Sequence, residues 1–225
     1  MKKSNITIYP AAALFNGRST YFNQALVQGL EEKGYRTNFP QRDGFEFGNL
    51  HEALRGELPE SEIPSAVENI IYYLDMGVFI PQSHVIVANL DEPQDEGVLV
   101  ELAHAKNIHK HTIGFRTDVR SPYGSSIDNF GGMHFFPALY LCDTFISHHM
   151  PCQTPQDTRS QMQGLVDKID EEISRQDFKP ITPITDNILF SGIEDIHSSE
   201  GLEELVTRYI SNKDKIASYG PKIIR

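Results

Sequence analysis

Short apolar runs separated by polar turns recur through the first 150 residues of the chain. The run at residues 85–90 is almost continuously apolar, which is typical of a strand buried on both faces of a parallel sheet. Residues 5–9 form a short strand that we expect to stop at Pro10, and residues 111–115 and 140–147 are interpreted as the fourth and fifth strands. The pattern therefore predicts a sheet of short strands.

Segments with apolar positions at helical spacing separate these strands. Residues 19–33 form one such segment, and Gly34 follows it as a typical helix C-cap residue. Residues 98–106 are interpreted as another helix. Residues 40–60 are rich in proline, glycine and polar side chains, so we expect a long loop there, and loops of that length are usually functional or mobile.

The clearest helical pattern lies between residues 65 and 78. Ser65 and Glu68 fit a capping box at its start. The apolar stripe that follows has the spacing of a helix face that packs on a core. It consists of Val67, Ile70, Ile71, Leu74 and Val78.

Strand and helix alternate up to about residue 150, and this alternation indicates the fold class. It predicts an α/β fold, flavodoxin-like or Rossmann-like, in which a doubly wound parallel sheet of five strands carries helices on both faces. In such folds ligands bind beyond the carboxyl ends of the strands, where the strand order reverses. We therefore expect the functional site in the polar loops that follow the strands.

The pattern changes after residue 150. An amphipathic segment at residues 158–175 predicts a helix, residues 177–186 resemble a linker with two prolines, and residues 201–212 predict a last short helix. This part has too little apolar mass to form a core of its own. We therefore expect an α/β domain over residues 1–150 and a mostly helical extension over residues 151–225, which packs on that domain or on a neighbouring subunit.

Composition and charge narrow the classes of function. The 225 residues include 20 Lys and Arg against 31 Asp and Glu, a formal net charge of −11, so no basic stripe is available for nucleic acid. The apolar runs are far shorter than the roughly 20 residues that span a bilayer, so no membrane partner is expected. Cys142 and Cys152 are too few for a disulfide framework, and the amino terminus does not resemble a signal peptide. We expect a cytoplasmic protein.

The turn and helix after the strand at residues 85–90 hold the most informative acidic residues. The helix macrodipole favours acids in a first turn, so Asp95 needs no functional explanation. Glu101 lies among apolar neighbours, where it either marks the solvent face or is a buried carboxylate with a partner, and the pattern leaves both interpretations open. If Asp95 is the N-cap, both carboxylates border one pocket. Two carboxylates in different environments suit glycosyl transfer.

Other candidates are weaker when taken from the pattern alone. Asp75 lies at the margin of the apolar stripe, and a boundary residue facing water is the simpler interpretation. Small residues between Tyr9 and Phe15 would let a ligand approach the backbone, but no dinucleotide-binding glycine motif or P-loop follows the first strand. Histidine pairs occur without the spacing of a zinc site, so we expect no metal and no cofactor.

Four elements together resemble a known enzyme family. They are Tyr9 and Phe15 after the opening strand, the segment Tyr72-Tyr73-Leu74-Asp75, the loop at residues 40–45 and the motif Asp95-x-Gly97-x-x-x-Glu101-Leu102-x-x-Ala105. In this register the chain resembles the nucleoside 2-deoxyribosyltransferase family over roughly residues 5–147. The resemblance implies a transferase that exchanges the bases of 2′-deoxynucleosides, with deoxynucleosides and free nucleobases as its small-molecule partners.

The resemblance also implies a role for each carboxylate. Glu101 would attack C1′ of the sugar and form a covalent deoxyribosyl-enzyme, with Tyr9 as the hydrogen-bond partner that orients it. Asp95 would protonate the departing base and deprotonate the incoming one. Asp75 would hold the base or sugar near that proton transfer. Neighbouring carboxylates would stabilise a transition state with oxocarbenium character.

Substrate-binding residues are implied in the same way. They are Phe15, Gln41, Asp43, Gly97 and Asn129. Phe15 and Gln41 would contact the base. In the family an Asn-containing stretch near the fifth strand binds sugar in the neighbouring subunit, but residues 137–141 lack an Asn, and whether Asn129 replaces it stays open. The resemblance implies a homo-oligomer, a dimer or a hexamer.

Two other functions remain open. A hydrolase would use the same glutamate with water as acceptor, acting on deoxynucleosides or their 5′-monophosphates, and Arg42, Arg116 and Arg120 are the candidates for binding a phosphate. A nucleoside-binding sensor on the same fold is the alternative without catalysis. The joint presence of Tyr9 and Glu101 with the two aspartates argues against a sensor, because a sensor needs no nucleophile.

Overall fold

The computed structural model describes residues 1–45, 47–118, 130 and 134–217 of the chain. The chain divides into two compact units. Unit 1 comprises Met1–Gln41 and Ile80–Thr182, and unit 2 comprises Arg42–Phe79 and Pro183–Arg225. In the described part of the chain no helix is both long enough and apolar enough to cross a membrane.

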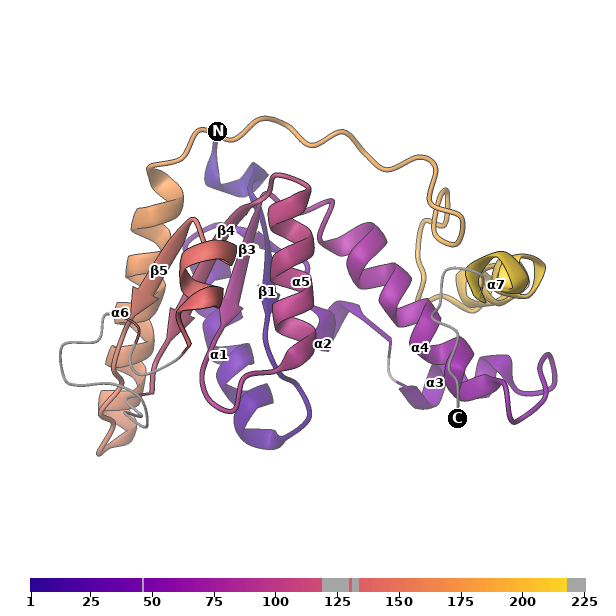
Figure 1. Ribbon diagram of the computed structural model, residues 1–225, viewed down its shortest axis with the longest axis horizontal. Coiled ribbons are helices and arrows are strands. Elements are labelled where there is room, and N and C mark those ends of the chain that lie inside the picture. The colour runs from indigo at the N-terminus through magenta and orange to yellow at the C-terminus, as the bar shows by residue number, and fades with distance from the viewer. Residues whose placement is uncertain (46, 119–129, 131–133, 218–225) are drawn as a thin grey trace. The chain divides into compact units, whose positions relative to one another are not determined.

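Unit 1 is built on a parallel sheet of five strands in the order β2-β1-β3-β4-β5 (Figure 1). The strands are β1 (Thr7–Ala11), β2 (Arg36–Thr37), β3 (Val85–Asn89), β4 (His111–Arg116) and β5 (Thr144–Ser147). This is the flavodoxin-like order, whose reversal between β1 and β3 is where ligands bind in such folds. The predicted fold class, a five-stranded parallel sheet with helices on both faces and a helical carboxyl-terminal region, is confirmed.

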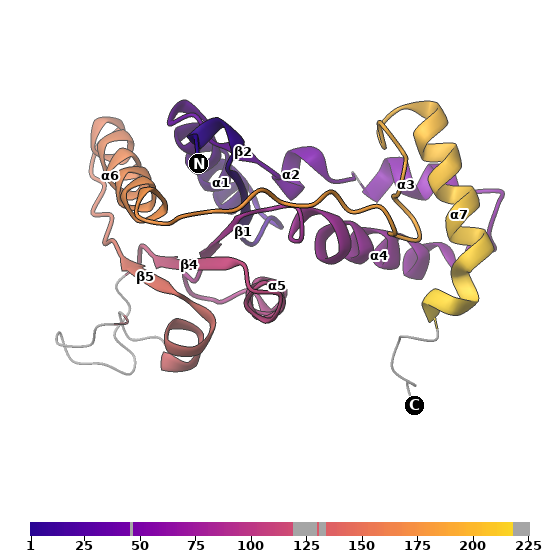
Figure 2. The ribbon, with the colours of Figure 1, turned by 90° about the horizontal axis from the view of Figure 1, so that it is seen from above.

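Helices cover both faces of this sheet. The 3-10 turn η1 (Lys3–Asn5) precedes β1, and α1 (Gly17–Glu32) and α6 (Pro155–Ser174) pack side by side on one face, as Figure 2 shows. α5 (Glu96–Asn107) packs against β1, β3 and β4 on the other face. Side chains alternate between the two faces, so Ile8 enters the core shared with α1 and α6 whereas Tyr9 points to α5.

Pro10 lies inside β1 and does not end it, so the predicted end of this strand was wrong. The backbone N–H groups of Arg36 and Asn38 donate to the carbonyls of Ile6 and Ile8, so the even-numbered residues of β1 face β2. β2 ends at Thr37, and the position of Pro10 therefore faces no further strand residue. A missing N–H costs the sheet nothing there.

α6 shows how the carboxyl-terminal region joins the sheet. Its buried stripe belongs to the same core as α1 and consists of Met162, Leu165, Val166, Ile169 and Ile173. A Cβ added at Gly29 of α1 would lie 2.7 Å from Cγ2 of Val166, so the close approach of the two helices requires glycine at that position. Unit 1 contains α6 together with the sheet, and the domain boundary expected at residue 150 stays a prediction.

Unit 2 is helical. It contains α3 (Phe47–Leu54), α4 (Ile63–Leu74), the π-helical turn η2 (Asp75–Phe79) and α7 (Ser199–Ala217), and the short α2 (Pro40–Asp43) spans its first residues. Leu50 and Leu54 are fully buried in a core shared with α4 and α7. The long loop predicted for residues 40–60 was therefore wrong, because its apolar residues pair with a helix some 150 residues further along the chain.

Two other local predictions differ from the structure. α4 begins at Ile63 with Glu62 before it, so Ser65 lies inside the helix and the predicted capping box does not form. Pro64 explains the earlier start, since proline is favoured in the first turn of a helix. Residues 137–141 form the π-helical turn η3 (Pro137–Leu141), and only the last part of the predicted fifth strand, Thr144–Ser147, is extended.

Two histidines lie at the amino-terminal edge of the sheet and contact the connecting segment after α6. His84 accepts a hydrogen bond from the backbone N–H of Thr7 at 3.0 Å, so its Nδ1 carries no proton. The ring of Phe178 lies edge-on to both His84 and His111, with centroid distances of 5.9 and 6.1 Å. Burial lowers the pKa of both histidines; Lys110 adds to this for His84, whereas Asp143 and Glu172 oppose it for His111.

We predict that unit 1 loses stability as the pH falls below about 6.5. In that range the unfolded chain protonates both histidines near their ordinary pKa of 6.5. The folded chain, in which burial lowers both pKa values, binds fewer of these protons, so the free energy of unfolding decreases with decreasing pH. The double variant His84→Asn, His111→Gln should show a smaller decrease, measured by thermal unfolding at about pH 7.5 and about pH 5.5. A double variant with the pH dependence of the wild type would contradict this assignment.

Candidate active site

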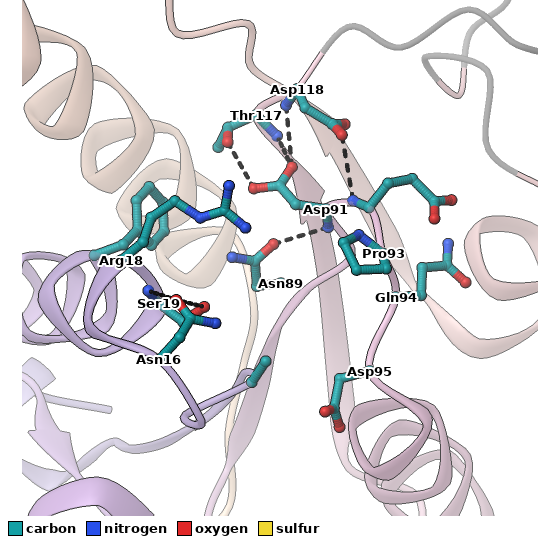
Figure 3. A pocket seen from close by; sticks show the side chains of 13 residues that line it. Asn16, Arg18, Ser19, Asn89, Asp91, Pro93, Gln94, Asp95, Thr117 and Asp118 are labelled. Atoms are coloured by element: carbon teal, nitrogen blue, oxygen red, sulfur yellow. Dashed lines mark hydrogen bonds between the residues drawn. The ribbon is translucent and has the colours of Figure 1, made fainter.

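The carboxyl ends of β1, β3 and β4 meet at one edge of the sheet and enclose a cavity of about 400 Å³. Its walls come from the first turns of α1, from the segment between Asn89 and Asp95 that follows β3, and from Thr117 and Asp118 after β4 (Figure 3). This is the edge at which the sequence predicted a site. Tyr9 and Glu101 do not line the cavity, whereas Asp95 does.

Tyr9 and Glu101 form a hydrogen-bonded pair beneath this edge. The Tyr9 side chain is fully buried, and its Oη donates to Oε1 of Glu101 at 2.8 Å. Glu101 is half-buried, in the second turn of α5, on the side that faces β1. The structure thus decides between the two interpretations of Glu101: its carboxylate has a buried partner 92 residues away in the sequence.

Asp95 is the N-cap of α5, as the sequence suggested. Its Oδ1 accepts the backbone N–H of Val98 at 3.1 Å. Within the described residues this is the hydrogen bond that the Asp95 carboxylate accepts, and Oδ2 is left for other partners. A Cβ at Gly97 would lie 3.0 Å from Oδ1 of Asp95, so a larger residue there would press on the cap. Asp95, Gly97 and Glu101 therefore occupy the first two turns of one helix.

The other predicted residues lie in different surroundings. Phe15 is 75% exposed in the segment after β1, and Gln41 donates to the carbonyl of Thr20 at 3.2 Å. Asp43 belongs to unit 2 and pairs with Arg42 at 2.7 Å. Asn129 lies outside the described residues.

Asp75 is the first residue of the turn η2 in unit 2, directly after α4. Burial raises the pKa of its carboxyl group to about 7. A carboxyl with such a pKa carries a proton part of the time at neutral pH, so it serves as a hydrogen-bond donor as well as an acceptor. The sequence pattern had favoured a boundary residue that faces water.

The three arginines considered for phosphate binding are differently placed. Arg116 is buried, with 1% of its side chain exposed, and its Nε donates to Asp118. Arg42 is engaged with Asp43, and Arg120 lies outside the described residues. Arg18, which was not predicted from the sequence, lines the cavity together with Asn16. Its position in the segment after the first strand of an α/β fold was the signal that could have indicated it.

A set of hydrogen bonds between the two loops that follow β3 and β4 was not predicted from the sequence. Asp91 accepts from the backbone N–H of Thr117 at 2.6 Å and from that of Asp118 at 3.0 Å. The hydroxyl of Thr117 donates to the other oxygen of Asp91 at 2.7 Å. Polar residues directly after two neighbouring parallel strands were the available signal. Among the described residues no three His, Cys, Asp or Glu side chains gather closely enough to hold a metal ion.

Comparison with known proteins gives a family for the chain. No curated protein matches it. A match among solved structures is the sugar isomerase domain of the RpiR transcription factor from Sphaerobacter thermophilus, 13% identical over 74% of this chain and 69% of that chain, with a TM-score of 0.36. The family model described as "Nucleoside 2-deoxyribosyltransferase" matches residues 8–134, more than half of the chain and a region that contains Tyr9, Asp95 and Glu101. The chain therefore belongs to the nucleoside 2-deoxyribosyltransferase family.

Proposed function

We propose that this protein exchanges the base of 2′-deoxynucleosides through a covalent deoxyribosyl intermediate on Glu101. The observation that carries this proposal is the hydrogen bond of 2.8 Å between the buried Tyr9 and Glu101, two residues within the region that matches the family. A half-buried carboxylate in the second turn of α5, oriented by a buried phenol, is suited to act as a nucleophile. Family membership supports a pentosyl-transferring enzyme in general.

The first half of the proposed reaction breaks the bond between sugar and base. A carboxylate oxygen of Glu101 forms a bond to C1′ while the C1′–N bond of the nucleoside breaks. The electron pair of that bond goes to the base nitrogen, and Asp95 in its protonated form supplies the proton that the departing base takes up. Positive charge develops on the sugar as the bond breaks, and the nearby carboxylates stabilise it.

The second half reverses these steps with another base. A nitrogen of the incoming base attacks C1′, the bond to Glu101 breaks, and Asp95 accepts the proton that the base loses. The supporting geometry is the cap: Oδ1 of Asp95 is held by the N–H of Val98, so the carboxylate has a fixed position at the helix start. Asp75, with its pKa of about 7, would donate to or accept from the base.

The alternative functions make different products from the same substrate. A hydrolase would transfer the sugar to water and release free deoxyribose, and a sensor would bind the nucleoside without consuming it. Phe15, exposed at the edge of the sheet, supports acceptance of a base because its ring offers a stacking surface. In solution the partners would be deoxynucleosides and free nucleobases, and the working form would be a homo-oligomer.

We predict that deoxyinosine and adenine together yield deoxyadenosine faster than free deoxyribose accumulates. The measurement is separation of the products by chromatography, with and without adenine. Free sugar that dominates even at saturating adenine would identify a hydrolase.

The variant Glu101→Gln keeps an oxygen that accepts from Tyr9 but is no nucleophile, so it should lose several orders of magnitude in rate. Glu171→Gln, an exposed carboxylate of α6, is its control and should keep the wild-type rate.

We predict that Asp95→Asn lowers kcat by about 10²–10⁴-fold with a small change in thermal stability, because an amide caps the helix but cannot transfer a proton. Asp95→Ala should lose activity and in addition about 0.5–2 kcal/mol of stability, the usual cost of removing an N-cap side chain. The checks are steady-state kinetics and thermal unfolding of both variants. An Asp95→Asn variant whose loss lies entirely in KM would reduce Asp95 to a binding residue.

A further inference from the structure

The two loops that follow the neighbouring strands β3 and β4 are joined by hydrogen bonds in which a carboxylate of each loop accepts backbone N–H groups of the other. Asp91, in the loop after β3, accepts hydrogen bonds from the backbone N–H groups of Thr117 and Asp118, at 2.6 and 3.0 Å, and from the hydroxyl of Thr117 at 2.7 Å. Figure 3 shows this group above Asp95 on the same wall of the cavity. The loop after β4 thus holds the loop after β3 through one side chain.

A hydrogen bond also runs in the opposite direction, from the loop after β3 to a carboxylate of the loop after β4. The carboxylate of Asp118 accepts the backbone N–H of Glu92 at 3.2 Å. Within its own loop, Asp91 donates its backbone N–H to Oδ1 of Asn89 at 2.9 Å. Two consecutive peptide groups, those of residues 91 and 92, are therefore fixed by side chains at the end of the strands. We call the set Asn89, Asp91, Thr117 and Asp118 the loop clasp.

A buried arginine, Arg116, donates a hydrogen bond to the loop clasp. Arg116 has 1% of its side chain exposed, and its Nε donates to Oδ1 of Asp118. Its Nη1 lies 4.0 Å from Oε1 of Glu92, and within the described residues neither Nη1 nor Nη2 has a hydrogen-bond partner. Removing Asp118 would leave a buried charge without its nearest counter-charge, which strongly destabilises a protein. Among the described residues Asp91 forms no hydrogen bond or ion pair with Arg116, and it is therefore the better residue to vary.

The loop clasp lies directly before the residue to which we assign the proton transfer. Asp91 is four residues before Asp95, and the backbone of Asp95 starts α5. The loop is thus held at both ends, by the clasp at residues 91 and 92 and by the cap at Val98. A catalytic group must stay within about 0.5 Å of its working position, and a shift of about 1 Å can cost 10²-fold in rate.

We propose that Asp91 is a positioning residue for the transfer reaction, holding Asp95 in place through its three hydrogen bonds to Thr117 and Asp118. This inference rests on the proposed function. The role of Asp91 is geometric, so the charge of its side chain is dispensable and the shape of that side chain is not. Both backbone N–H groups donate to Oδ1, and the Thr117 hydroxyl donates to Oδ2. An asparagine keeps the first two bonds and donates its amide to the Thr117 hydroxyl, whereas an alanine loses all three.

The test compares Asp91→Ala with Asp91→Asn in the base-exchange assay. Asp91→Ala should lower kcat by about 10- to 100-fold with KM within about threefold of the wild type, and Asp91→Asn should stay within about threefold in both. Thr117→Val, which removes one of the three hydrogen bonds, should lower kcat by a smaller factor. Thr117→Ser keeps the hydroxyl and should keep the wild-type kcat. These two variants carry the test if Asp91→Ala does not fold.

Asp157→Ala is the matched control. Asp157 accepts the same kinds of donor, the backbone N–H groups of Gln153 and Thr154 and the hydroxyl of Thr154, but it does so at the start of α6. Asp157→Ala should lower the unfolding temperature as Asp91→Ala does, yet keep the wild-type kcat. Hydrogen exchange of the peptide that contains the Val98 amide should accelerate in Asp91→Ala and stay unchanged in Asp157→Ala.

The outcomes separate the two proposals. An active wild type whose Asp91→Ala variant keeps its kcat, or whose Asp91→Asn variant loses as much as the alanine, would overturn the positioning role and leave the transferase intact. A wild type that exchanges no base would overturn the proposed function and, with it, the role of Asp91 in that reaction. Equal losses of kcat in Asp91→Ala and Asp157→Ala would reduce the loop clasp to a general contribution to stability.

Discussion

The pairing of β1 with β3 is the interaction on which the sheet and the candidate site both depend. Tyr9 is in register with Ile86, and the two strands run in the same direction. The chain therefore leaves both strands at one edge, and the segment after β3 brings Asp95 and α5 beside β1. Side chains alternate along a strand, so a slip of one residue would turn Tyr9 from Glu101 toward the core shared with α1 and α6.

Polar groups at this edge serve the fold and the proposed chemistry together. Asp95 satisfies a backbone N–H at the start of α5 while it offers a second carboxylate oxygen to the cavity. The loop clasp pairs backbone donors that strand ends would otherwise leave without partners. A buried arginine beneath it is tolerated because Asp118 lies against its guanidinium group. Removing any of these carboxylates thus changes local structure as well as charge, and variants that keep shape are the informative ones.

Some of the site was accessible from the sequence because it is local. The buried strand at residues 85–90 and the N-cap Asp95 lie within a few residues of each other, and strand propensity and capping act over that range. The spacing from Asp95 to Glu101 needed no knowledge of other segments, because both lie on one helix. The prediction of residues 40–60 failed for the opposite reason: Leu50 and Leu54 are core residues only because α4 and α7 cover them. Short apolar segments take the structure that their distant partners allow.

The sequence by itself determined the alternation of strands and helices, the parallel sheet and the acidic turn before α5, since periodicity and capping follow from neighbouring residues. Only the tertiary structure decided which groups meet. The phenol that holds Glu101 is 92 positions away, the donors to Asp91 are 26 and 27 positions away, and α6 joins the core of the sheet through Gly29 and Val166. These contacts arise from strand order and register, which depend on long-range burial of apolar surface and leave no local mark in the chain.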